Sequence, residues 1–452
     1  MIKVCSNMII MEISRGGEKM GNLIFLTVVV VEIAFAVFCI STKSNQQKVR
    51  NIIRIEAFVL FLLCIILPII EWSFRYYTLA ALLFLMAVMG TVALIRKKEE
   101  IREYKTARVV LKSIGMMVLI VTLTLPAIIF PQHKAMGVTG EYRVKTLAQT
   151  YTDTKRVETY TDTDENRKLN VKIWYPENAE GTYPLMVFSH GAFGIKSSNE
   201  SLYNELASHG YVVCSIDHTY QCLFTKGEDG HTTRIDMGYM EECSADNARV
   251  DRQKSYEYYQ KWMGIRTGDI NFVIDHILAE AKNNNAETVY KLVDTAKIGV
   301  MGHSLGGSAA LGIGRMRDDV SAVIALESPF MCDIKGVKDG EFVFEDEIYP
   351  VPVLNVYSNS SWKFLSEWPQ YAENYAMLSG TNTTAFNVYM SGVGHLSLTD
   401  FALTSPFFTR IFDGQKSTTS AEDCLNTISK ICLEFFDCYL KGEGKFTSVG
   451  NY

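Results

Sequence analysis

The chain of 452 residues lacks the short motifs that mark a protein-bound metal ion. It contains no C-x-x-C pair, no zinc-type spacing of cysteine and histidine, and no H-E-x-x-H motif. We therefore expect no metal site, and we expect that the reaction needs no cofactor. No internal repeat or low-complexity tract is present either, so the chain does not have the pattern of a repeat protein.

An obvious disulfide framework is also missing. Seven of the ten cysteines lie after residue 130, and this odd number leaves at least one thiol there without a partner in the same part of the chain. Cys222 and Cys243 flank a predicted loop. Either a bridge between them or two buried thiols fits the sequence.

Positive charge is scarce in the globular part. Of the 44 Lys and Arg and the 50 Asp and Glu, residues 1–130 contain 15 and 8, which leaves 29 and 42 for residues 131–452. An acidic globular part argues against nucleic acid as a partner. The first part is basic and apolar instead.

Four apolar stretches occupy this first part, at residues 22–40, 55–70, 76–95 and 109–130. The second stretch is the shortest and contains Pro68, whereas the others are long enough to cross a bilayer. Trp72, Tyr76 and Tyr77 cluster between the second and third stretches, where an interfacial belt of aromatic residues belongs. The sequence therefore predicts an N-terminal bundle of about four transmembrane helices, with the lipid bilayer as a partner.

Basic residues in the predicted loops indicate the orientation of this bundle. They gather after the first and third stretches and are few after the second and fourth. Because basic loops stay in the cytoplasm, the globular part is predicted to be extracytoplasmic, on a multi-pass protein of the cell membrane. Lys3, Arg15 and Lys19 favour the opposite orientation unless translation begins at Met20.

The rest of the chain has the pattern of an α/β domain. Residues 131–150 form a predicted linker, and the domain spans residues 151–452. Its first two strands, 156–161 and 169–175, alternate apolar and polar residues and are predicted to pair in antiparallel fashion. Apolar runs separated by helical patterns follow at residues 183–189, 211–216, 320–326 and 351–356. This alternation predicts a mostly parallel sheet covered by helices, with a polar insertion over an active site at residues 218–252.

The stretch KIGVMGHSLGG at residues 297–307 carries the sharpest chemical signal. It combines an apolar run, Ser304 between glycine-bearing pairs, and a helix-prone continuation. This is the strand–turn–helix setting of the nucleophile elbow G-x-S-x-G in the α/β-hydrolase fold. The turn is so tight that Ser304 is predicted to be strained, and Gly302 and Gly306 are needed because a β-carbon there would collide with neighbouring elements.

A nucleophilic serine needs a histidine base, and the base needs a carboxylate, in the chain order serine, acid, histidine. Of the eight histidines only His395 follows Ser304, and it lies in a glycine-rich turn after a predicted strand. Glu327 directly ends the strand at residues 320–326 and is the leading candidate for the acid. Asp333, in the loop that follows, is held in reserve.

The oxyanion of the tetrahedral intermediate needs two preorganised N–H donors. One is predicted to be the amide of Leu305, directly after the nucleophile. The other is assigned to Ala192, in the turn after residues 183–189, because the small neighbours Gly191 and Gly194 let this backbone approach a substrate. His190 is expected to shape the turn rather than to act as a base.

These motifs resemble those of the platelet-activating factor acetylhydrolase family, the secreted and type II intracellular phospholipase A2-like α/β hydrolases. The resemblance covers about residues 183–401 and rests on FSHG at 188–191, LASHG at 206–210, GHSLGG at 302–307, ALE at 325–327, VGH at 393–395 and DF at 400–401. It implies Ser304, His395 and position 327 as nucleophile, base and acid, with the amides of Ala192 and Leu305 as oxyanion donors. It also implies calcium-independent hydrolysis of phospholipids with short or oxidised sn-2 acyl chains.

The chain departs from the family pattern in three places. Glu327 stands where the family has aspartate, the membrane helices have no counterpart, and residues 217–252 differ in content. We expect a membrane-anchored serine esterase or lipase of lipid catabolism, with an ester or phospholipid substrate. Two alternatives stay open: a carboxylesterase or acyltransferase acting on another ester, and a non-catalytic membrane sensor with a ligand-binding hydrolase-like domain.

Overall fold

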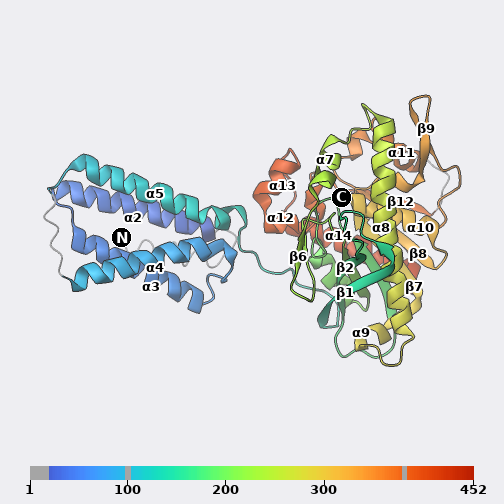
Figure 1. Cartoon of the computed structure of the whole chain (residues 1–452), viewed down its shortest axis with the longest axis horizontal. Coiled ribbons are helices and arrows are strands. Elements are labelled where there is room, and N and C mark those ends of the chain that lie inside the picture. The colour runs from blue at the N-terminus through green and yellow to red at the C-terminus, as the bar shows by residue number, and fades with distance from the viewer. Residues whose placement is uncertain (1–19, 97–102, 379–383) are drawn as a thin grey trace. The chain divides into compact units, whose positions relative to one another are not determined.

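The computed structural model describes residues 20–96, 103–378 and 384–452 (Figure 1). The chain divides into two compact units. The first contains the described residues up to Ala135 together with Leu403–Thr409, and the second contains those of Met136–Ala402 and Arg410–Tyr452. Several basic residues used above for the orientation lie outside the described residues: Lys3, Arg15, Lys19, Lys97, Lys98 and Arg102.

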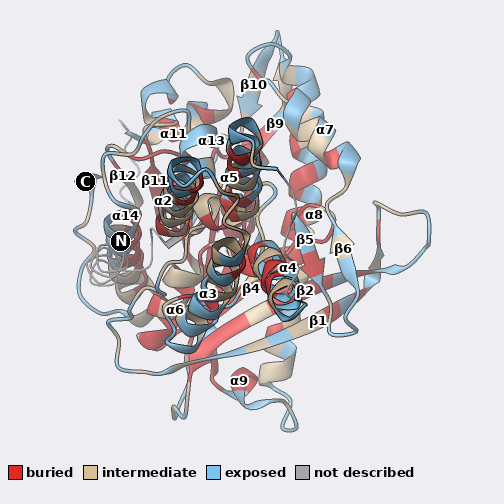
Figure 2. Cartoon of the chain, turned by 90° about the vertical axis from the view of Figure 1, so that its left-hand side faces the viewer, coloured by how far each residue is buried: buried red, intermediate tan, exposed pale blue. Residues whose placement is uncertain are grey.

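Four described helices build the bundle of the first unit: α2 (Met20–Ser41), α3 (Gln47–Ile66), α4 (Phe74–Ile95) and α5 (Thr106–Ile129). Helix α3 packs against α4, and α2 packs against α5. Many residues of these four helices are exposed (Figure 2), and they include large apolar side chains such as Leu60, Leu85 and Leu111. A helix that is apolar on its outer face as well as its inner face suits a lipid environment.

Three of these helices, α2, α4 and α5, are long and apolar enough to cross a membrane, as far as the described residues go. The N-terminal bundle is thus confirmed, but the second predicted span is wrong in position. Helix α3 ends at Ile66, before Pro68, and begins at Gln47 rather than at residue 55. The first half of α3 contains four charged residues, Lys48, Arg50, Arg54 and Glu56. Charged side chains disfavour burial of this half in hydrocarbon.

In the second unit, nine of the described strands form one sheet in the order β1-β2-β4-β3-β7-β8-β11-β12-β13. Its strands are β1 (Val144–Val157), β2 (Asn166–Pro176), β3 (Tyr183–Ser189), β4 (Val212–Asp217), β7 (Val293–His303), β8 (Val320–Leu326), β11 (Val353–Tyr357), β12 (Ala385–Tyr389) and β13 (Gly450–Asn451). The pairs β1–β2 and β2–β4 are antiparallel, and the other pairs of this sheet are parallel. The predicted mostly parallel sheet is confirmed.

Helices cover both faces of this sheet. Successive residues of β3 point to opposite sides, since Leu185 and Val187 belong to one core cluster and Met186 and Phe188 to the other. Helices α8 (Arg252–Ala281) and α10 (Leu305–Met316) supply the first cluster, and α6 (Glu200–Ser208) and α14 (Ala421–Phe436) the second. Because both faces are buried, the central strands are continuously apolar.

The first strand lies earlier than predicted. Val144 of β1 pairs with Pro176 and Asp153 pairs with Arg167, so residues 144–150 belong to the sheet and not to a linker. Strand β1 lies at the edge of the sheet and is partly exposed there. The alternation of apolar and polar residues along it is therefore weak in the sequence.

The predicted insertion at residues 218–252 contains regular structure of its own. It holds a hairpin of β5 (Phe224–Lys226) and β6 (Thr232–Arg234), followed by helix α7 (Met237–Ala245). Cys222 and Cys243 are both free thiols. The remaining short elements are α9 (Thr288–Lys291), β9 (Ile334–Lys338), β10 (Glu341–Phe344), α11 (Ala372–Leu378), α12 (Phe401–Thr404) and α13 (Pro406–Phe412).

Packing around the elbow provides a test of stability. A β-carbon at Gly306 would lie 2.0 Å from the carbonyl oxygen of Ser189, whereas one at Gly264 in α8 would have no described neighbour within 4 Å. We expect Gly306→Ala to destabilise the protein by about 3 kcal/mol or more, because a backbone atom yields less readily than a flexible side chain. Gly264→Ala, the matched control, should stabilise it by about 0.5–1 kcal/mol through helix propensity. Denaturant unfolding of both variants measures the difference, and equal stabilities would contradict this packing.

Candidate active site

The elbow has the strained geometry that the sequence predicts. Ser304 connects β7 to α10 with φ 55° and ψ −126°, a backbone conformation that is rare outside glycine. A β-carbon at Gly302 would lie 2.4 Å from the backbone of Gly306, which explains why glycine is needed on both sides of the serine. The Ser304 hydroxyl is therefore carried by a turn that the surrounding backbone holds rigidly.

A cavity of about 640 Å³ lies beside this serine. Its wall contains the three side chains expected from the sequence, Ser304, Glu327 and His395, together with Leu305. Much of the remaining wall is aromatic, from Tyr259, Phe364, Trp368, Tyr371 and Phe412. The volume is in the range of small-molecule binding sites.

Glu327 follows β8 directly, with a positive φ of 54°, and its side chain is buried. Burial raises the pKa of Glu327 to about 7, although the Ser361 side chain and, to a smaller extent, Ser358 oppose the rise. The Ser358 N–H donates to Oε2, whereas Oε1 is buried without a hydrogen-bond partner in the described part of the chain. Leaving a buried oxygen without a hydrogen bond costs free energy. A hydrogen bond from the N–H of a histidine to Oε1 would therefore be favourable.

His395 lies in the turn after β12, and both of its backbone polar groups are held. Its N–H donates to Ser360 Oγ at 3.0 Å, and its carbonyl accepts a hydrogen bond from His303 Nε2 at 3.0 Å. Burial lowers the pKa of His395 to about 4, so the ring is a neutral base at physiological pH. Among the described residues its ring forms no hydrogen bond with Ser304 or Glu327, a common condition before a substrate binds.

Sequence reasoning missed His303, the residue before the nucleophile. Its ring is buried, with its centroid 4.5 Å from that of His395. A β-carbon at Gly191 would meet His303 Nδ1 at 2.8 Å. His303 thus separates the turn of His395 from the turn after β3, and the motif gave no sign of this because G-x-S-x-G leaves its position open.

The reserve acid, Asp333, is used elsewhere. Its Oδ2 accepts hydrogen bonds from Arg315 Nε at 3.0 Å and from Arg315 Nη2 at 2.8 Å. It is not among the residues that line the cavity. Glu327 is therefore the acid that the geometry favours.

The turn after β3 lies against the nucleophile, as an oxyanion turn must. A β-carbon at Gly191 would lie 3.2 Å from Ser304 Cβ. Ala192 is the next residue, and Phe193 follows with a positive φ of 62°. Leu305 is the first residue of α10, so its N–H has no acceptor inside that helix. Both candidate donors thus belong to backbone segments that border Ser304.

A second row of serine, histidine and aspartate lies beneath this turn. Ser189 Oγ donates to His218 Nε2 at 2.8 Å, and His218 Nδ1 donates to Asp269 Oδ2 at 2.9 Å. All three side chains are buried, and Arg167 donates two hydrogen bonds of 2.6 Å to the same carboxylate. Ser189 has no access to a substrate, so this row is structural.

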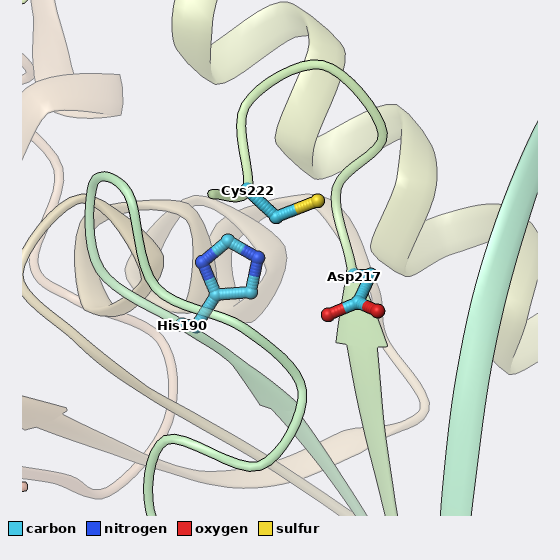
Figure 3. A group of neighbouring side chains, drawn as sticks. All are labelled: His190, Asp217 and Cys222. Carbon is cyan, nitrogen blue, oxygen red and sulfur yellow. The ribbon is translucent and has the colours of Figure 1, made fainter. Parts of the chain in front are cut away.

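His190, Asp217 and Cys222 gather beside this row (Figure 3), and all three are buried. These residue types are common metal ligands. However, the Lys196 ammonium pairs with the Asp217 carboxylate. Both nitrogens of His190 are also engaged, Nδ1 with Gly191 O at 2.7 Å and Nε2 with the His218 N–H at 3.3 Å. The protein's own hydrogen bonds thus account for this cluster.

The sequence model of the family described as "Platelet-activating factor acetylhydrolase, isoform II" matches residues 131–449. The chain belongs to this family. The match begins after α5, so it does not include the helical bundle.

Individual relatives of this family member are distant. Platelet-activating factor acetylhydrolase of Gallus gallus is 22% identical over 274 residues, which cover 57% of this chain and 62% of the relative. Cutinase est1 of Thermobifida alba is 27% identical over 154 residues, 34% of this chain and 38% of the relative. A solved ferulic acid esterase from Streptomyces cinnamoneus shares 21% identity with a TM-score of 0.52, covering 69% of this chain and 94% of that chain.

These matches confirm the family resemblance found in the motifs and the α/β-hydrolase fold. The names of the family and of these relatives denote enzymes that cleave carboxylic esters. The chain spans 62% and 38% of the two curated relatives, less than two thirds of either.

The raised pKa of Glu327 predicts the pH dependence of ester hydrolysis. A triad acid must be ionised to stabilise the imidazolium of its base. The pKa of the candidate acid Glu327 is about 7, whereas that of the candidate base His395 is about 4. We therefore expect kcat/KM to rise with pH through about 7. This acidic limb of the pH–rate profile reports the ionisation of Glu327 and not that of His395. Glu327→Gln should remove this limb and lower kcat by about 10⁴-fold.

Two further variants identify the acid. Glu327→Asp keeps the carboxylate and should keep measurable activity with a shifted limb. Asp333→Asn should leave kcat within about threefold of the wild type while lowering the melting temperature, because Arg315 loses its partner. Loss of activity in Asp333→Asn with Glu327→Gln still active would assign the acid to Asp333.

Proposed function

We propose that this protein is a membrane-anchored serine esterase that hydrolyses short or modified acyl esters of phospholipids in lipid catabolism. The observation that carries the proposal is the strained Ser304, which shares one cavity with Glu327 and His395. A serine held in this way at the head of a helix is the arrangement that acyl transfer to a hydroxyl requires.

The chemistry follows from these positions. Ser304 Oγ attacks the ester carbonyl while His395 takes its proton, and Glu327 stabilises the imidazolium that forms. The amides of Ala192 and Leu305 hold the negative oxygen of the tetrahedral intermediate. His395 then protonates the leaving alcohol, and a water activated by the same histidine releases the acid.

Two features support a phospholipid substrate. The bundle brings the enzyme to a bilayer, where the local concentration of lipid esters is high. Lys363 lines the cavity and offers a cation for a phosphate group.

A carboxylesterase acting on another ester is the second candidate, because the cavity wall is aromatic. The rings of Phe364 and Trp368 stack with their centroids 5.1 Å apart. Such a wall also suits an aromatic or polymeric ester, and the chain is similar to a cutinase and to a ferulic acid esterase.

A panel of p-nitrophenyl esters, from acetyl to long acyl chains, tests the proposal. We expect hydrolysis by the purified full-length protein, fastest on short chains, and a loss of about 10⁶-fold in Ser304→Ala. Short-chain activity that extends to phospholipids with a short sn-2 chain supports the first candidate, and activity restricted to aromatic esters supports the second. Equal rates for the wild type and Ser304→Ala on every ester would contradict both.

The membrane topology is proposed separately: all four helices cross the cell membrane, and the hydrolase unit is extracytoplasmic. Helix α3 is not among the three helices that are apolar enough to cross a membrane by composition, as far as the described residues go. Its crossing decides on which side the chain leaves the membrane, because three crossings would place the two ends of the bundle on opposite sides. We expect alkaline phosphatase, which is active only outside the cytoplasm, to be active when fused after Tyr452. A fusion after Glu103, between α4 and α5, should be inactive, and the reverse pattern would overturn the orientation.

A further inference from the structure

Arg266 is a buried arginine of α8 whose hydrogen-bond partners are all neutral within the described structure. Nε donates to Gln221 Oε1 at 2.7 Å, and Nη1 donates to the carbonyl oxygen of His190 at 2.5 Å. Nη2 donates to the carbonyl oxygen of Gly191 at 3.5 Å and to Tyr239 Oη at 3.4 Å. A guanidinium with an exposed fraction of 0% is normally paired with a carboxylate.

The carboxylates nearby already have other cations. Arg167 binds both Glu158 and Asp269, and Lys196 binds Asp217. Among the described residues, Arg266 therefore forms no ion pair, and its positive charge lies against the turn after β3. Burying such a charge is expensive, so its retention calls for a role that neutral side chains do not fill.

The two carbonyls that Arg266 contacts belong to the oxyanion turn. The carbonyl of Gly191 and the N–H of Ala192 are parts of one planar peptide group and point in opposite directions. The Gly191 oxygen accepts hydrogen bonds from His190 Nδ1 at 2.7 Å, from the Gly194 N–H at 3.1 Å and from Arg266 Nη2 at 3.5 Å. With this carbonyl held on the side of α8, the Ala192 N–H points away from Arg266.

The tautomer of His190 is set by the same network. Its Nε2 accepts the backbone N–H of His218 at 3.3 Å, so the ring proton resides on Nδ1, where it is donated to Gly191. Burial and the nearby Arg266 charge both lower the pKa of His190, which keeps the ring neutral. His190 is thus a fixed donor to the peptide that Arg266 also binds.

We propose that Arg266 and His190 are positioning residues for the oxyanion hole. They orient the Gly191–Ala192 peptide, and the unpaired charge of Arg266 stabilises the negative oxygen that forms on the far side of that peptide. The inference rests on the proposed function, because it requires Ser304 to attack an ester. Neither side chain touches the substrate.

This role predicts a specific kinetic signature. A neutral substrate carbonyl gains little from a buried positive charge, whereas the oxyanion of the transition state gains much more in a site of low dielectric. Loss of the charge should therefore lower kcat and leave KM nearly unchanged.

The test uses the full-length protein and the fastest p-nitrophenyl ester of the panel. Arg266→Gln should lower kcat by about 100-fold with KM within about threefold, and Arg266→Lys, which keeps the charge, by about 10-fold. An alkyl boronic acid, which forms a negatively charged tetrahedral adduct with Ser304, should bind Arg266→Gln more weakly by the same factor as kcat/KM falls. His190→Ala should also lower kcat, and His190→Asn, whose amide can replace Nδ1–H, should restore most of it.

The matched control is Arg317→Gln, which removes an arginine paired with Asp275 and Asp319 outside this network. It should keep wild-type kcat and boronic acid affinity. A folded Arg266→Gln with unchanged kcat, or with lower kcat but unchanged boronic acid affinity, would overturn the inference. If Arg266→Gln does not fold, unchanged kcat in both Arg266→Lys and His190→Ala would overturn it. A wild type without Ser304-dependent hydrolysis would instead mean that the proposed function itself has failed.

Discussion

The close approach of the Ser304 turn to the end of β3 is the contact on which the candidate site depends. A β-carbon at Gly306 would strike the carbonyl oxygen of Ser189, and one at Gly191 would press on Ser304 Cβ and on the His303 ring. Only glycines at both places let the two backbones touch. This single contact brings the nucleophile, the candidate oxyanion turn and, through His303, the turn of His395 into one region.

Burial then determines the electrostatics of this region. It raises the pKa of the Glu327 carboxyl and lowers that of the His395 ring, so that both groups lean towards their neutral forms before a substrate binds. The negative charge of an oxyanion would enter a site of low dielectric, where fixed dipoles and a buried cation act strongly. The polar network beneath β3 fits this setting, because Arg167 and Lys196 pair with carboxylates while the described hydrogen-bond partners of Arg266 are neutral.

Glutamate in place of the family's aspartate is compatible with this backbone. Glu327 has a positive φ, and its Oε2 accepts the N–H of Ser358, at the end of the neighbouring strand β11. The longer side chain is thus anchored by one oxygen, and the other stays unpaired near the cavity. Glu327 therefore remains the candidate acid although the residue type differs.

From the sequence alone followed the features that local pattern carries: the apolar helices, the buried parallel strands, the strained elbow, and the order of serine, acid and histidine. These features depend on residues that are close together in the chain, so they can be predicted from the sequence. The edge strand β1, the charged start of α3, the ion pair that removes Asp333 from consideration, and the roles of His303 and Arg266 required the tertiary structure. Each of these features depends on contacts between segments far apart in the chain or on which face of an element is exposed. Residue spacing does not reveal such contacts or such exposure. The buried Ser189–His218–Asp269 row shows the difference most clearly, because the residue types of a triad are present there and only burial decides that they do not meet a substrate.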